Sequence, residues 1–179
     1  MHDPVAKNSS QANPLPAHIR RADTADVDAL AHHRVSMFRA MGVLAEEDSD
    51  VLRIASVEYF RRAIASGEYL AWVAATNADP TIIVAGAGLR IDPILPRPGQ
   101  RGICLGPDGM LLNVYTEPAW RGMGLASRLV REILDEARAR QLERVNLHAT
   151  DEGRRVYEKI GFVPTNEMRF TITGRVAAQ

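Results

Sequence analysis

The stretch LLNVYTEPAWRGMGLASRLVREIL, residues 111–134, contains the pattern that decides the fold. An apolar run ends before Pro118, an arginine and two glycines follow, and a long amphipathic pattern then begins. Glycine is a poor helix former, so two glycines at the mouth of a helix need a reason. We infer that another molecule comes very close to this backbone.

Gly122 and Gly124 leave bare backbone beside the first turn of the predicted helix. Free N–H groups and the positive end of the helix dipole make such a turn a cradle for an anion, most often phosphate. A tight turn without a ligand would explain the glycines equally well. A P-loop does not fit because RGMGLAS has no lysine, and a dinucleotide-binding fingerprint does not fit because Ser127 replaces its third glycine.

Length, charge and cysteine content bound the class of protein. The 179 residues suit one compact domain with a sizeable core. The formal net charge is zero, which gives no reason to expect nucleic acid or an anionic membrane as a partner. Cys104 is the single cysteine, so an internal disulfide is excluded and a zinc cluster is disfavoured.

The N-terminal residues differ in composition from the remainder of the chain. The sequence MHDPVAKNSSQANPLPAH is rich in polar residues and proline and has no apolar core of a signal peptide. No apolar run in the chain approaches the roughly 18 residues of a membrane span. We therefore expect a flexible tail over residues 1–16 and a single cytoplasmic domain over residues 17–179.

The hydrophobic patterns predict a mixed α/β sheet with the element order β-α-α-β-β-β-α-β-α-β and one strand-helix-strand crossover. The strands are expected at 17–22, 69–76, 81–91, 110–116, 144–150 and 162–172, and the helices at 22–42, 51–65, 125–137 and 151–161. Asp23 is the expected N-cap of the first helix. Residues 92–108, with four prolines and three glycines, are expected to form a long and functional loop.

The sequence Arg-Gly-Met-Gly-Leu-Ala, residues 121–126, resembles the Arg/Gln-x-x-Gly-x-Gly/Ala phosphate loop of the GNAT superfamily of acyl-CoA N-acyltransferases. The sequence VYEKIGF, residues 156–162, resembles the last helix of that family and the strand after it. The resemblance is specific from about residue 110 to residue 162. It implies an α/β (α+β) fold whose mixed, mostly antiparallel sheet has splayed central strands and about four flanking helices.

The resemblance also implies that acetyl-CoA is the cosubstrate and that no metal is needed. The strand before the loop would bind the pantetheine arm in the gap beside the next strand, and the loop amides would hold the pyrophosphate. The cofactor-binding residues implied in this way are Val114, Tyr115, Thr116, Arg121, Gly122, Met123, Gly124, Leu125, Ala126, Ser127 and Thr150. Thr150 stands where the family often has asparagine, and its hydroxyl could instead be a helix N-cap.

Tyr157 is the catalytic acid that the resemblance implies. Transfer of an acyl group from a thioester expels a thiolate, and a tyrosine with an ordinary pKa near 10 is protonated at neutral pH and can supply a proton. The alternative is that Tyr157 is a core aromatic residue beside Val156 and Ile160.

A base is also required, because a lysine-like amine is mostly protonated at pH 7. His148 ranks first because it lies on the predicted strand beside the pantetheine arm. The other candidates are Glu117, Glu46, Glu47 and Asp48. His32 and His33 have no carboxylate or cysteine at ligand spacing in the sequence, so they are interpreted as structural.

The function predicted from these features is acetyl transfer from acetyl-CoA to a primary amine of a small molecule or peptide, by direct attack. The first two helices and residues 92–108 would wall the acceptor site. No nucleic-acid or membrane partner is expected, and a homodimer is left open. The competing hypotheses are an acyl-CoA-binding sensor without turnover and a nucleotide-phosphate-binding protein that uses the same glycines.

Overall fold

The computed structural model describes residues 16–100 and 102–171. Apart from Pro16, the predicted N-terminal tail lies outside the described residues. The chain divides into two compact units, Met1–His148 and Ala149–Gln179. The single domain over residues 17–179 stays a prediction.

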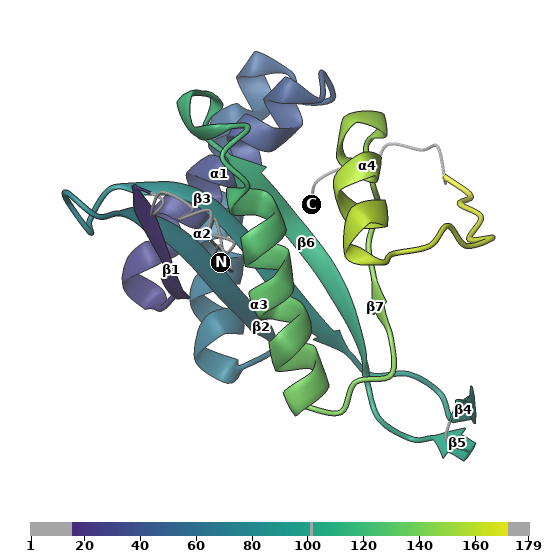
Figure 1. Ribbon diagram of the computed structural model, residues 1–179. Coiled ribbons are helices and arrows are strands. Elements are labelled where there is room, and N and C mark those ends of the chain that lie inside the picture. The colour runs from purple at the N-terminus through teal and green to yellow at the C-terminus, as the bar shows by residue number, and fades with distance from the viewer. Residues whose placement is uncertain (1–15, 101, 172–179) are drawn as a thin grey trace, which may run out of the picture. The chain divides into compact units, whose positions relative to one another are not determined.

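In the described residues of the first unit, five strands form one sheet in the order β1-β2-β3-β6-β7 (Figure 1). Their bounds are Ala17–Arg21 for β1, Tyr69–Thr76 for β2, Ile83–Asp92 for β3, Asp108–Thr116 for β6 and Val145–Asn146 for β7. The pairs from β1 to β6 are antiparallel, and β6 pairs with β7 in parallel. The mixed, mostly antiparallel sheet is therefore confirmed, with its single crossover between β6 and β7.

The helices also agree with the sequence pattern. Their bounds are Val27–Ala40 for α1, Ser49–Ser66 for α2, Leu125–Ala139 for α3 and Asp151–Ile160 for α4 in the second unit. Short 3₁₀ turns lie at Thr24–Asp26 (η1), Glu46–Asp48 (η2) and Pro118–Trp120 (η3). Among the described residues, no helix combines the length and the apolar character that crossing a membrane requires.

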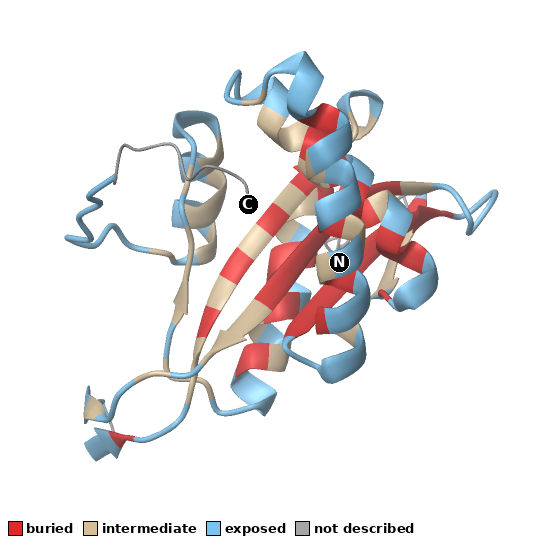
Figure 2. Cartoon of the chain, turned by 180° about the vertical axis from the view of Figure 1, so that it is seen from behind, coloured by how far each residue is buried: buried red, intermediate tan, exposed pale blue. Residues whose placement is uncertain are grey.

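Both faces of the sheet are covered by helices in the first unit. Figure 1 shows α3 in front of the sheet and α1 and α2 behind it. Alternate β2 side chains, Tyr69, Ala71 and Val73, join Leu30 of α1 and Phe60 of α2 in one buried cluster. Figure 2 shows the buried residues concentrated on the central strands, as expected for a sheet that is packed on both sides.

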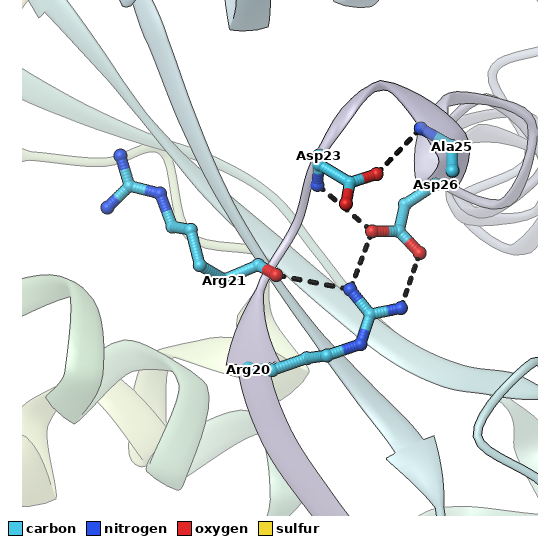
Figure 3. Close-up of polar contacts among 5 residues, drawn as sticks. All are labelled: Arg20, Arg21, Asp23, Ala25 and Asp26. Atoms are coloured by element: carbon cyan, nitrogen blue, oxygen red, sulfur yellow. Dashed lines mark hydrogen bonds and ion pairs between the residues drawn. The ribbon is translucent and has the colours of Figure 1, made fainter.

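The entry to α1 is fixed by a network of carboxylates and one arginine (Figure 3). Asp23 caps η1, because its Oδ1 accepts the N–H of Ala25 at 2.7 Å, while Asp26 Oδ2 accepts the N–H of Asp23 at 3.0 Å. Arg20 of β1 donates two bonds of 2.7 Å to the Asp26 carboxylate. Burial alone would raise the pKa of Asp26, but these hydrogen bonds outweigh it and hold the pKa below its usual value. Asp23 therefore caps the turn that leads into α1, whereas the N-cap position of α1 itself is Asp26. The network ties this entry to the edge of the sheet.

Two of the predicted strands differ from the structure: one is shorter than predicted, and the other is not formed in the described residues. The strand expected over 144–150 is limited to Val145–Asn146, because these two residues alone have pairing partners on β6. The expected strand at 162–172 is not formed over 162–171, and Ile172 lies outside the described residues. Pro164 has no N–H to donate, and Val163 and the described residues after it are exposed, so neither pairing nor packing supports a strand there.

The predicted loop over residues 92–108 contains a small hairpin. Its strands are β4, Arg97–Gly99, and β5, Gly102–Cys104, which pair antiparallel as a separate two-stranded sheet. Arg97 attaches β4 to the main sheet, because its guanidinium lies 2.7 Å from Asp108 and 3.4 Å from Glu143. The hairpin therefore joins the main sheet at the Asp108 end of β6, opposite to the Thr116 end.

Candidate functional site

Strands β6 and β7 are paired at one end and open at the other. Their register is Gly109 with Val145 and Met110 with Asn146. From Leu111 to Thr116, no strand of the described chain pairs with the β6 edge that faces away from β3. This is the predicted splay, and it leaves backbone groups of Val114, Tyr115 and Thr116 available to a ligand that runs along the strand.

A β-bulge lies in β6 just before that open segment. Gly86 of β3 opposes Tyr115, whereas Gly88 opposes Leu112, so β6 has one residue more than β3 in this interval. Asn113 takes a left-handed conformation with φ of 57°, and its side-chain N–H₂ donates to the Leu30 carbonyl of α1 at 3.3 Å. Asn113 was not among the predicted site residues, although an asparagine inside an apolar strand is a signal for a bulge because asparagine tolerates this conformation.

The two glycines of the loop take the conformation that only glycine adopts without strain. Gly122 has a φ of 78° and Gly124 a φ of 79°. A Cβ atom built on either glycine would meet no described atom within 4 Å outside its immediate neighbours. The backbone therefore faces open space on this side, which is the room that a phosphate group would need.

Helix α3 begins directly after Gly124 and presents its free amides at the same place. The amide of Arg128 donates to the Gly124 carbonyl at 3.1 Å, which closes the first turn of the helix. Arg128 is the first residue of α3 whose N–H bonds within the helix. The N–H groups of Leu125, Ala126 and Ser127, which lie before it in the chain, have no partner within the helix. Together with the helix dipole, they make a site that fits a pyrophosphate group.

Arg121 is held at the end of β6, next to the cradle. Its Nε donates to the Thr116 carbonyl at 3.1 Å, and its guanidinium carbon lies 5.8 Å from the centre of the Tyr115 ring. This bond uses one of the five N–H donors of the guanidinium. The side chain is exposed, so it can add a charge-assisted contact to an anion in the cradle.

Glu117 follows β6 directly and meets two histidines of α1. Its Oε1 lies 3.1 Å from His32 Nε2 and 3.6 Å from His33 Nε2. The His33 ring also packs against the Tyr115 ring at a tilt of 40°, with ring centroids 5.2 Å apart. The sequence places no carboxylate at ligand spacing from these histidines, but the fold brings Glu117 to His32 from 85 residues away. Their interpretation as structural residues stays a prediction.

The two histidines differ in their surroundings. The His33 side chain is 1% exposed, and burial together with the neighbouring His32 lowers the pKa of His33 to about 4. His33 is therefore neutral at neutral pH. The His32 side chain is 63% exposed, and the hydroxyl of Ser36 lies 3.5 Å from its Nε2.

The other base candidates lie in different surroundings. His148 follows the end of β7 by two residues and is exposed, so it does not lie on a strand as predicted. Glu46, Glu47 and Asp48 form η2 between α1 and α2, where Glu46 pairs with Arg39. Among the described residues, no group of three or more His, Cys, Asp or Glu side chains could hold a metal ion.

The second unit carries Thr150 and Tyr157 on α4. Thr150 is the N-cap, because its Oγ1 accepts the N–H of Gly153 at 3.1 Å. The Tyr157 ring packs edge-on against Phe162 with centroids 5.9 Å apart, and a Cβ on Gly153 would lie 3.2 Å from its Cε2. Burial raises the pKa of Tyr157, so its hydroxyl stays protonated to higher pH than that of a free tyrosine.

Comparison with known proteins agrees with this geometry. The model of the Acetyltransferase (GNAT) family matches residues 30–162, a range that contains β6, the cradle, α3 and Tyr157. The curated proteins give no match to this chain.

Several solved structures are similar over nearly their whole length. A GCN5-related N-acetyltransferase from Ralstonia eutropha JMP134 has a TM-score of 0.76 and 26% identity, over 88% of this chain and 99% of its own. A predicted acetyltransferase from Clostridium acetobutylicum, solved with acetyl-CoA, has a TM-score of 0.74 and 27% identity, over 87% and 96%. Glucosamine-6-phosphate N-acetyltransferase from Arabidopsis thaliana, at 16% identity and a TM-score of 0.62 over 88% and 99%, shows similarity of fold alone.

Proposed function

The chain belongs to the Acetyltransferase (GNAT) family, and on this premise we propose that it transfers the acetyl group of acetyl-CoA to the nitrogen of an amine. The observation that carries the proposal is the cradle at the start of α3. Two left-handed glycines, open space in front of them and unused helix amides lie beside the open edge of β6. A helix N-terminus of this kind favours a pyrophosphate.

Each part of acetyl-CoA has residues that fit it. The amides from Gly122 to Ser127 would hold the pyrophosphate, and the Arg121 guanidinium would add a contact. The outward-facing edge of β6 at Val114–Thr116, which has no partner strand in the described chain, would bond the amides of the pantetheine arm, as an added strand does. The Thr150 hydroxyl accepts a bond from Gly153 and keeps its own hydrogen to donate. Bound acetyl-CoA supplies an activated acetyl thioester.

Tyr157 is the proposed acid for the departing sulfur. Its pKa is raised by burial, so it holds a proton that it can give to the thiolate. A thiol has an ordinary pKa of about 8.5, so the thiolate is not a very poor leaving group. The acid should therefore increase the rate by a modest factor of roughly 10².

The acceptor is proposed to be a primary amine of a small molecule or a peptide in the cytoplasm, with neither nucleic acid nor a membrane as partner. A monomer and a homodimer are both compatible with this function. His148 is the base that the sequence ranks first, but the strand position that favoured it is absent. Glu117 lies at the end of the strand that would bind the pantetheine arm and is the stronger candidate.

Thermal unfolding with added ligands separates this function from the alternatives. Acetyl-CoA at 100 times its Kd should stabilise the protein by about 2.7 kcal/mol. Equal concentrations of NAD and ATP should have a smaller effect, and a larger effect of either would favour the nucleotide-phosphate binder. Release of free CoA thiol with a panel of polyamines, amino acids, aminoglycosides and peptides then distinguishes an enzyme from an acyl-CoA sensor, which would bind without turnover.

A further inference from the structure

Arg34 of α1 differs from the other half-buried arginines of the described chain. Four arginines among the described residues are half-buried. Three of them donate to the carboxylate of a neighbouring aspartate, namely Arg20, Arg90 and Arg97. Arg34 forms no ion pair with a described residue, so its positive charge has no counter-ion there. A partly desolvated cation without a counter-ion favours the binding of an anion.

Two uncharged aromatic side chains are the partners of Arg34. Its guanidinium carbon lies 4.9 Å from the centre of the Phe38 ring, one helical turn further along α1. Burial raises the pKa of the Tyr69 phenol on β2 against the lowering effect of the Arg34 charge, so the phenol stays protonated and neutral. The Tyr69 hydroxyl oxygen is buried and has no hydrogen-bond partner among the described residues. Neither aromatic side chain can therefore neutralise Arg34.

Arg34 lies on the part of α1 that covers the bulged segment of β6. One turn before it, the Leu30 carbonyl accepts the side-chain N–H₂ of Asn113. Directly before it, the His33 ring packs against the Tyr115 ring. Residues four apart on a helix lie on the same face, so Arg34 belongs to the face of α1 that carries the buried Leu30. The Arg34 side chain therefore lies on the side of the sheet that α1 and α2 cover.

The acetyl group of bound acetyl-CoA would lie close to this segment of β6. The cradle at the start of α3 follows Thr116, so a pantetheine arm on the open edge would run from Thr116 back along the strand toward the bulge at Asn113. The thioester is at the end of the arm that is far from the pyrophosphate. An acceptor that approaches the thioester from the side of α1 would therefore have Arg34 within reach.

Resting on the function proposed above, we propose that the acceptor amine also carries a carboxylate or phosphate group, and that Arg34 binds this group. The planar guanidinium presents its N–H donors as a fork that fits two oxygens of either anion. Binding of the anionic end at Arg34 holds the amine at the other end of the acceptor toward the acetyl group. Arg34 takes part in no proton transfer and no bond change, so it determines which amines are accepted.

A structural role is the competing explanation, because a guanidinium above the Phe38 ring also stabilises α1. The two explanations differ in which acceptors are affected by a substitution at Arg34. Loss of an anion-binding residue weakens the binding of anionic acceptors and has little effect on acceptors without an anionic group. A structural defect in α1 reduces the rates with all acceptors alike.

The first experiment compares acceptors in pairs that differ in the anionic group. Amino acids are compared with their carboxamides to test the carboxylate, and phosphoethanolamine is compared with ethanolamine to test the phosphate. The wild type should have an at least about tenfold higher kcat/KM for the anionic member of one pair, and that pair identifies the anion. Equal rates within both pairs, or acetylation confined to amines without an anionic group, would overturn the proposal and leave the proposed function standing.

The second experiment uses Arg34→Met, whose unbranched side chain can still pack on Phe38 but carries no charge. With the preferred anionic acceptor, kcat/KM should fall by about 10- to 100-fold, mainly through a higher KM. With the other member of the pair, the loss should be less than about threefold. Arg34→Lys keeps the charge but not the fork, so it should lose less than Arg34→Met. Titration calorimetry should give the wild-type Kd for acetyl-CoA in both variants.

Arg61→Met is the matched control, because Arg61 is exposed on α2 and forms no part of the proposed site. It should behave as wild type with every acceptor. Equal losses for Arg34→Met with both members of a pair, or a wild-type KM for the anionic member, would overturn the role of Arg34. A wild-type protein that acetylates no amine at all would instead contradict the proposed function.

Discussion

Gly67 and Gly124 share almost the same backbone conformation, with φ 76° and ψ 6° at Gly67 and φ 79° and ψ 6° at Gly124. A Cβ atom would meet open space at both positions. Gly67 ends α2, whereas Gly124 precedes the first turn of α3. Alanine substitutions at the two positions should therefore cause the same backbone strain, but only the substitution at Gly124 should also affect the candidate phosphate site.

Gly124→Ala and Gly67→Ala should destabilise the fold to a similar extent, by about 1–2 kcal/mol, because alanine is strained in the left-handed region. Gly124→Ala alone should weaken acetyl-CoA binding, since its methyl group projects beside the amides that would hold the pyrophosphate. Thermal unfolding measures the first quantity, and titration calorimetry with acetyl-CoA measures the second. Equal Kd values for the two variants would mean that the glycines only form a turn.

The buried His33 should make stability depend on pH between about 6.5 and 4. Its pKa is near 6.5 in the unfolded chain and about 4 in the folded protein, so the unfolded state binds more protons in this window. The free energy of unfolding should therefore be fully retained above pH 6.5 and fall by about 3 kcal/mol on acidification to pH 4. Denaturant unfolding at a series of pH values gives this slope.

His33→Gln should remove this part of the pH dependence, and His18→Gln, at a half-buried position on β1, should keep it. The contribution of Asp26, whose pKa is held below its usual value, is present at neutral pH and is lost only at lower pH, below about 4. The contributions of His33 and Asp26 to the pH dependence of stability therefore fall in different pH ranges. An unchanged slope in His33→Gln would show that this histidine is not kept neutral by burial.

Tyr157→Phe should keep the edge-on contact with Phe162 and remove only the proton donor. Stability and acetyl-CoA affinity should change little, while kcat should fall by roughly ten- to a hundredfold when chemistry limits the rate. Tyr59→Phe, which removes a hydroxyl from α2, is the control and should turn over normally. A wild-type kcat for Tyr157→Phe would make this tyrosine a packing residue and leave water as the acid.

Gly88→Ala should destabilise the sheet, because a Cβ at this position would lie 2.0 Å from the hydroxyl oxygen of the buried Tyr69. Overpacking of this kind costs about 1–3 kcal/mol. Adding Tyr69→Leu removes the obstructing ring end and should make the Gly88→Ala step nearly neutral in that background. If denaturant unfolding shows that the free-energy changes of the two substitutions are fully additive in the double variant, the contact with Tyr69 is not the cause of the destabilisation.

The parts of the fold that the sequence predicted are those whose signals are local. The two glycines lie directly before α3 as the sequence predicted, and Asp23 caps the 3₁₀ turn that leads into α1; both signals act within a few residues. The extent of β7 and the absence of a strand at 162–171 depend on whether a partner strand lies alongside. Strand propensity alone carries no such information.

The site divides in the same way. The candidate phosphate loop is a contiguous segment, so its residue types and spacing were enough to predict it, and phosphate binding there stays a prediction. The contact of Glu117 with His32 and His33 exists because α1 packs under the end of β6, and no spacing within the sequence encodes that. Asn113 is itself a local signal for a bulge, because of its residue type. Gly86 and Gly88 of β3 lie opposite the bulge, but this follows only from the pairing register of β3 with β6.

Acetyl transfer to an amine nitrogen is measured most directly by mass spectrometry of an amine panel incubated with the protein and trideuteroacetyl-CoA. We expect that at least one amine gains a trideuterated acetyl group on nitrogen, and that Tyr157→Phe and Glu117→Gln slow its formation. If the protein binds acetyl-CoA but labels no amine faster than a reaction without protein, the chain is a sensor rather than an acetyltransferase.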